Sequence, residues 1–112
     1  MTQRVLCRFN DLGEGEARAF GPFDNSRQKA FVVRKGERLY AWWDSCPHNE
    51  GAPMAWRTNA YLNAARDRIV CASHGAEFEI ETGLCRLGAA LGRSLTPAPI
   101  EATPSGDVIF KT

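Results

Sequence analysis

The two histidines of this chain each follow a cysteine at close spacing. One pair lies in Cys46-Pro47-His48 and the other in Cys71-Ala72-Ser73-His74, and the chain has no further histidine. Thiolates are soft anionic ligands and neutral imidazoles are borderline ones, and both bind transition metals. The spacing therefore predicts a metal centre to which two separate segments contribute. Its four candidate ligands are Cys46, His48, Cys71 and His74.

A CxH pair followed by a CxxH pair fits a [2Fe–2S] cluster with mixed ligands. In such a cluster two cysteines bind one iron and two histidines bind the other. Two loops must approach a rhombic cluster from opposite sides, so each loop gives one cysteine to one iron and one histidine to the other. The pattern predicts that both cysteines share one iron and both histidines share the second.

Three other interpretations of the four residues compete with this one. A structural zinc site is the first, although zinc fingers usually combine CxxC with HxxxH pairs, each closing on one ion. Cys–His nucleophilic catalysis is the second, but it needs a single pair and leaves the duplication unexplained. The third is chance, which would have to place both histidines of the chain beside cysteines.

Short strands joined by turns must position these ligands. The expected strands are Val5–Arg8, at a sheet edge, then Ala17–Phe20, Ala30–Arg34, Arg38–Trp43, Arg68–Val70, Phe78–Glu81, Leu95–Ala102 and Asp107–Lys111. β-branched and aromatic residues around Lys35-Gly36 indicate one hairpin, and Pro104-Ser105-Gly106 indicates the turn of a closing hairpin. The pattern predicts an all-β fold, with a sandwich or barrel as scaffold.

The ligand segment, 44 to about 87, is inserted between these hairpins. It predicts a small cluster-binding subdomain within a single domain, 1–112. Residues 55–66 interrupt the strand pattern and indicate a loop with a helical turn. Because strand side chains alternate, one of Trp42 and Trp43 should lie in the core and the other on a partly exposed face.

Composition excludes several classes of function. The chain has 112 residues, and 14 basic and 13 acidic side chains give a net charge of +1, which leaves no basic surface for nucleic acid. No apolar run is long enough to cross a membrane, and the first residues lack the core of a signal peptide. We therefore expect a cytoplasmic protein, in which Cys7 and Cys85 are reduced, packed and not iron ligands.

Over nearly its whole length the chain resembles the Rieske iron–sulfur family, and most of all the small soluble ferredoxins of ring-hydroxylating dioxygenases. The two ligand motifs, the stretch Phe78–Gly83 and Leu95-Thr96-Pro97 carry the resemblance. It implies one [2Fe–2S] cluster at the tip of a small β subdomain. It also implies a one-electron carrier rather than an enzyme, with a flavin-dependent reductase as donor and an oxygenase as acceptor.

Two alternatives to a ferredoxin remain open. The first is a small subunit or regulatory module of a larger redox enzyme, similar to those of nitrite reductases, which should expose a large apolar patch. The second is a zinc-stabilised binding module without redox activity.

Departures from the family pattern predict a low potential. High-potential Rieske proteins have a disulfide between the two ligand loops, where this chain has Gly51 and Ser73. They also have a serine and a tyrosine that donate hydrogen bonds to the cluster sulfurs, where this chain has Ala76 and Phe78. Donors to sulfur stabilise the reduced cluster, so their loss favours a low potential.

Two further departures concern the loops. Twenty-two residues, 49–70, separate His48 from Cys71, which is longer than the usual connection. The extra length indicates either a partner-docking surface or simply a longer loop. The segment Gly88-Ala89-Ala90 lacks the proline that the family often has in the loop shielding the cluster, so shielding by this loop is not predicted.

Overall fold

The computed structural model describes residues 3–23, 29–47, 54–55, 59–71, 75–88 and 90–111. These residues form nine strands and one 3-10 turn, and no α-helix. The elements are β1 (Gln3–Arg8), η1 (Phe9–Asp11), β2 (Ala17–Phe20), β3 (Ala30–Lys35), β4 (Arg38–Trp43), β5 (Arg68–Cys71), β6 (Ala76–Glu79), β7 (Cys85–Leu87), β8 (Ile100–Ala102) and β9 (Asp107–Lys111). The predicted all-β class is confirmed. No helix among the described residues is long and apolar enough to cross a membrane.

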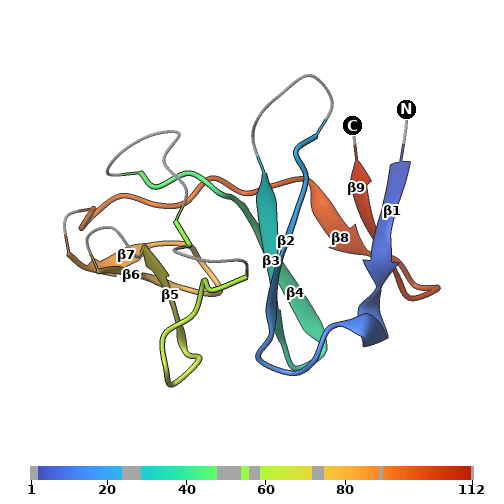
Figure 1. Ribbon diagram of the computed structural model, residues 1–112, viewed down its shortest axis with the longest axis horizontal. Coiled ribbons are helices and arrows are strands. Elements are labelled where there is room, and N and C mark those ends of the chain that lie inside the picture. The colour runs from blue at the N-terminus through green and yellow to red at the C-terminus, as the bar shows by residue number, and fades with distance from the viewer. Residues whose placement is uncertain are drawn as a thin grey trace.

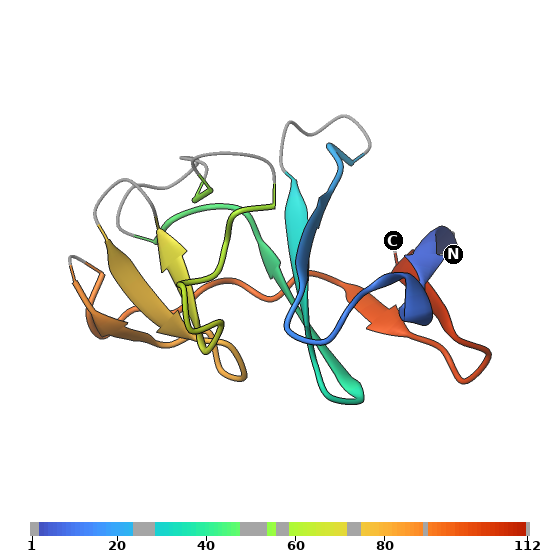
Figure 2. The same ribbon diagram turned by 60° about the horizontal axis from the view of Figure 1, so that its bottom comes forward.

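Three antiparallel sheets of three strands follow one another across the molecule (Figures 1 and 2). The sheet β5-β6-β7 lies at one end, the sheet β1-β9-β8 at the other, and β2-β3-β4 between them. The first and last strands lie side by side in Figure 1, because β1 pairs with β9, with Gln3 opposite Lys111. Among the described strands β1 has a neighbour on one side only, so its predicted edge position is confirmed.

The hairpin β3–β4 forms the centre of the middle sheet. Its register places Ala30 opposite Trp43 and Lys35 opposite Arg38, which confirms the predicted hairpin and extends its first strand by one residue, to Lys35. Gly36 adopts a φ of 64° in the turn, a conformation that glycine reaches without steric cost. The hairpin therefore carries the chain directly into the first of the two ligand segments, Cys46-Pro47-His48, which follows β4. The second ligand segment is Cys71-Ala72-Ser73-His74, which begins at the last residue of β5.

Two apolar cores lie on the two faces of this hairpin. The first contains Phe31, Val33, Trp42, Cys46, Met54, Tyr61, Ile69, Cys71, Ala76, Phe78, Ile80, Cys85, Ala90 and Leu95, and the second contains Leu12, Phe23, Ala30, Val32, Val108 and Phe110. On β4, Trp42 is buried in the first core, whereas half-buried Trp43 packs against the second, with its ring nearly perpendicular to that of Phe23. The predicted division between the two tryptophans is confirmed.

The third sheet differs from the prediction in two places. β6 begins at Ala76, two residues before the expected start at Phe78, because Ala76 already pairs with Cys71 of β5. It ends at Glu79, whose carbonyl accepts a hydrogen bond from Gly83 N at 2.9 Å and so closes the turn that was expected at Thr82-Gly83. β7 was not predicted, because three residues are too few to show alternation.

The closing hairpin is shorter than expected. Of the predicted strand Leu95–Ala102, only Ile100–Ala102 forms a strand, paired with β9. Pro97 and Pro99 have no amide hydrogen to donate to a neighbouring strand, which accounts for the late start. The predicted turn at 104–106 connects β8 to β9.

The residues before Ile100 instead pair with the end of β4. Trp43 N donates to Thr96 O at 2.9 Å, and Ala98 N donates to Ala41 O at 3.1 Å. Pro97 forms an isolated bridge with Trp42 between these two bonds. The segment between residues 43 and 96 thus begins and ends at neighbouring positions, beside the end of β4.

The predicted loop 55–66 is described at Ala55 and at residues 59–66. These residues form turns and an isolated bridge between Leu62 and Ile69, and none of them is helical. The remaining residues of the predicted loop, 56–58, lie outside the described part of the chain.

Candidate metal centre

The two candidate cysteine ligands lie at the ends of different strands. Cys46 follows β4, and Cys71 is the last residue of β5. Both are buried, with 1% and 0% of their surface exposed, and both belong to the first core. His48 and His74 lie outside the described residues, among which no group of three or more metal-binding side chains occurs. The complete set of four ligands therefore stays a prediction.

The second ligand segment connects two paired strands. Cys71 on β5 lies opposite Ala76 on β6, and Gly75 N donates to Cys71 O at 2.8 Å. Gly75 has a φ of 68°, and a Cβ atom there would meet nothing within 4 Å. The register of β5 and β6 therefore fixes the two ends of the segment in which the sequence places His74, and the residues between those ends, 72–74, lie outside the described part of the chain.

The first ligand segment is held by the carboxylate of Asp44. Asp44 Oδ1 accepts a hydrogen bond from Met54 N, and Oδ2 accepts one from the Tyr61 hydroxyl, both at 2.8 Å. Burial raises the pKa of Tyr61, and the hydrogen bond to Asp44 adds to the rise, so the phenol stays protonated as a donor. The sequence did not point to Asp44 or Tyr61, because neither belongs to a recognised ligand motif.

A third loop, after β7, contacts the first ligand segment and β6. Arg93 Nη1 donates to Pro47 O at 2.9 Å, and Cys85 N donates to Arg93 O at 2.8 Å. Ala90 is fully buried in the first core, although the loop lacks the proline of the family pattern. A Cβ atom at Gly88 would lie 2.8 Å from Ala76 Cα, so this loop approaches β6 closely. No local sequence signal pointed to Arg93, since its partner lies 46 residues away.

Of the four positions on which the predicted potential rests, Ala76 and Phe78 lie in the first core, whereas Gly51 and Ser73 lie outside the described residues. Ala76 and Phe78 on β6 are fully buried. Neither side chain has a hydroxyl, so neither can donate a hydrogen bond to a cluster sulfur.

The two remaining cysteines are not in disulfides, as predicted. Cys85 is buried, and its thiol donates to Leu87 O at 3.3 Å. Cys7 is half-buried, and burial raises the pKa of its thiol, which disfavours the thiolate. That neither residue binds iron stays a prediction.

The donor chemistry at the ligand segments fits an iron–sulfur cluster. Two thiols with apolar surroundings come from two separate segments of the chain, and thiolate is the ligand by which proteins hold iron–sulfur clusters. The buried surroundings also limit access of solvent, one of the factors that set the potential of such a centre.

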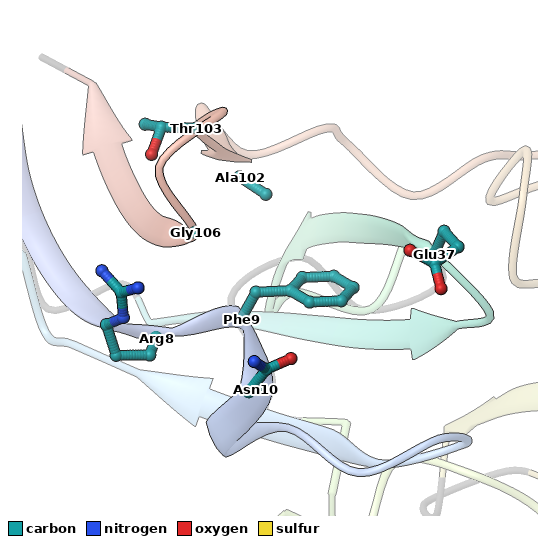
Figure 3. A pocket seen from close by; sticks show the side chains of 7 residues that line it. All are labelled: Arg8, Phe9, Asn10, Glu37, Ala102, Thr103 and Gly106. Atoms are coloured by element: carbon teal, nitrogen blue, oxygen red, sulfur yellow. The ribbon is translucent and has the colours of Figure 1, made fainter.

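A separate hollow of about 210 Å³ lies at the opposite end of the molecule, beside β1 and the β8–β9 turn (Figure 3). It is lined by Arg8, Phe9, Asn10, Glu37, Ala102, Thr103 and Gly106. The Arg8 guanidinium at its wall binds Asp107 Oδ1 at 2.7 Å and Ser105 O at 3.0 Å. No cysteine or histidine lines this hollow, so it is not part of the candidate metal centre.

Comparisons with known proteins agree with the geometry. The family model of the Rieske [2Fe-2S] domain matches residues 2–100, whereas no curated protein sequence matches the chain. The ferredoxin of carbazole 1,9a-dioxygenase from Nocardioides aromaticivorans has a TM-score of 0.69 at 20% identity, with all of both chains covered. A Sphingomonas yanoikuyae ferredoxin has a TM-score of 0.67 at 18% identity, with 99% of each chain covered.

A third similar structure is a complex of reduced oxygenase and oxidized ferredoxin in carbazole 1,9a-dioxygenase. The matched chain has a TM-score of 0.70 at 22% identity, and the match covers 96% of this chain and 92% of that one. Longer chains in related complexes also match, with a TM-score of up to 0.73, but this chain covers only 27% of their length. The same fold thus occurs both as a whole chain and as a part of a longer one.

Proposed function

The chain belongs to the Rieske [2Fe–2S] domain family, and from this premise we propose that it binds one cluster and carries electrons one at a time between redox proteins. The observation that carries the proposal is the burial of Cys46 and Cys71, from two separate ligand segments, in one core. A bound cluster would supply reversible uptake of a single electron.

The proposed ligands divide between the two irons by chemistry. Cys46 and Cys71 would bind one iron, and His48 and His74 would bind the other. The whole chain, 1–112, would act as one domain, in which the segment from 44 to about 87 binds the cluster. The close packing of the Arg93 loop on this segment supports the proposal, because a carrier needs its ligand loops held in place.

The proposed partners are a flavin-dependent reductase as electron donor and an oxygenase as acceptor, both in the cytoplasm. A similar ferredoxin, from a carbazole dioxygenase, forms a complex with its oxygenase, which supports the acceptor. The net charge of +1 favours neither nucleic acid nor an anionic membrane surface as a partner. Catalysis would take place in the partner rather than in this chain.

The second candidate function, a module of a larger redox enzyme, is favoured by the match to part of longer chains. A permanent subunit would need a large apolar surface. Among the described residues, the exposed large apolar side chains are Val5 on β1 and Leu87 and Leu91 near β7, at opposite ends of the molecule. This distribution favours a carrier with small contact areas.

Spectroscopy of the purified protein tests the proposal. Anaerobic preparation followed by reduction should give a visible absorption that bleaches and a rhombic electron paramagnetic resonance signal. Iron and sulfide analysis should give two of each per chain. A colourless protein that contains one zinc per chain would instead show a zinc-stabilised module.

A further inference from the structure

The long connection between the two ligand segments is bound to the chain just before the first ligand. Asp44 lies two residues before Cys46, and its two carboxylate oxygens accept hydrogen bonds from Met54 N and from the Tyr61 hydroxyl. Met54 and Tyr61 are both buried, with 0% and 2% of their surface exposed. Hydrogen bonds to a charged acceptor are about twice as strong as neutral ones, so Asp44 is an effective anchor.

Tyr61 in turn connects this anchor to the strand that ends at the second cysteine ligand. Its ring stacks on Phe31 of β3, with ring centroids 4.1 Å apart and planes at 9°. Its carbonyl oxygen accepts a hydrogen bond from Val70 N at 2.8 Å, one residue before Cys71. A continuous route of two hydrogen bonds and one side chain therefore joins Asp44, near the first ligand, to β5.

The same connection is also bound to the scaffold. Ala19 N on β2 donates to Asn59 Oδ1 at 2.8 Å, and Arg66 Nη1 donates to Gly15 O at 3.0 Å. β2 is an outer strand of its sheet, so the first of these bonds satisfies an edge amide. Asn59, Tyr61 and Arg66 of the connection thus all make contacts within the molecule.

We propose that Asp44 is a positioning residue for the metal centre, whose carboxylate holds the first and second ligand segments together through Tyr61 and Met54. The added length of the connection would then serve as an internal brace rather than as a docking surface. The inference rests on the proposed function, because it assumes that the cluster binds between these segments. Its consequence is slow opening of the ligand segments and therefore slow loss of the cluster.

The variant Tyr61→Phe tests the brace, because it removes one hydrogen bond to Asp44 and keeps the ring on Phe31. The matched control is Tyr40→Phe, at the only other tyrosine, whose hydroxyl makes no hydrogen bond to any described residue. With excess EDTA, bleaching of the cluster absorption should be about tenfold faster in Tyr61→Phe than in the wild type, as expected for loss of a bond to a carboxylate. The control should bleach at the wild-type rate.

The paramagnetic resonance spectrum separates positioning from simple stabilisation. Looser ligand segments should broaden the lines of the reduced Tyr61→Phe protein, whereas a contact that only stabilises the fold would leave them unchanged. If Tyr61→Phe does not fold, Asp44→Asn keeps the size of the side chain but removes its charge and replaces one acceptor oxygen with an NH2 donor, and the same faster bleaching and broader lines are expected.

Two results would overturn the inference. Equal bleaching rates and equal line widths in Tyr61→Phe and Tyr40→Phe would show that the bond to Asp44 does not position the ligands, while the proposed function would stand. A wild-type protein that contains no cluster would instead contradict the proposed function, and the positioning role of Asp44 would fall with it.

Discussion

Arg93 donates a 2.9 Å hydrogen bond from Nη1 to the carbonyl oxygen of Pro47, the residue between the first cysteine and histidine of the ligand motifs. The bond places a permanent positive charge at the first ligand segment. A positive charge stabilises the reduced, more negative form of a cluster, so this contact has a consequence for potential as well as for structure.

Arg93→Gln should lower the midpoint potential of the cluster by about 20–40 mV, the size expected for one solvent-screened charge. Arg93→Lys should restore most of the potential, because it keeps the charge. The control is Arg38→Gln, which removes the same charge at the start of β4, the end of the strand farther from Cys46. Protein-film voltammetry of the four proteins measures the effect, and equal shifts in Arg93→Gln and Arg38→Gln would contradict it.

Cys71→Ser should abolish the visible colour and the rhombic paramagnetic signal, because the cluster would lose one thiolate ligand. None of the other described cysteines lies at the end of β5, where it could replace that ligand. Cys85→Ala is the matched control, since Cys85 is equally buried but donates its thiol hydrogen to Leu87 O. Iron content should remain at the wild-type value in this control and in Cys7→Ala. Retention of colour in Cys71→Ser, or half the iron in either control, would show that the ligands are assigned wrongly.

The midpoint potential of the wild-type protein should lie near −150 mV, the low end of the range for Rieske centres. Ala76 and Phe78 are buried beside the ligand segment and carry no hydroxyl. Phe78→Tyr and Ala76→Ser each add a donor and should raise the potential, which voltammetry measures. A wild-type value above about +200 mV would show that backbone donors or burial dominate.

Gly88→Ala should destabilise the protein more than Gly92→Ala. Both glycines have positive φ values, 100° and 86°, so both substitutions have a backbone cost of about 1–2 kcal/mol. Only the new Cβ at position 88 would meet a backbone atom, Ala76 Cα at 2.8 Å, which adds about 1–3 kcal/mol for overpacking. Chemical denaturation of the two variants measures the difference, and equal losses would mean that the third loop can move away from β6.

Local patterns in the sequence were sufficient to predict much of the scaffold. Ala17–Phe20 and Arg38–Trp43 form strands with the predicted bounds, because alternation and turn residues determine them locally. Where a bound depends on other parts of the chain, the prediction was less accurate. The start of β6 depends on its pairing with Cys71, and the start of β8 depends on the absence of amide hydrogens at Pro97 and Pro99.

The metal centre, too, could be predicted from the sequence only in part. The family resemblance is confirmed, and the cysteines of the two motifs lie buried in one core. The contacts that hold the ligand segments, from Asp44 to Tyr61 and from Arg93 to Pro47, join residues 17 and 46 positions apart. Such pairs leave no trace in the spacing of a single sequence, because periodic patterns report only on residues close together along the chain.

The hydrogen bonds of Trp43 with Thr96 and of Ala98 with Ala41 have an evolutionary consequence. Segments whose two ends meet can be inserted into a protein, lengthened or exchanged with little disturbance of the host. Residues 44–95 begin and end beside each other at these bonds. Relatives can therefore diverge in the length of this segment while they keep the same strands around it, and hybrids with segments from two relatives should still fold.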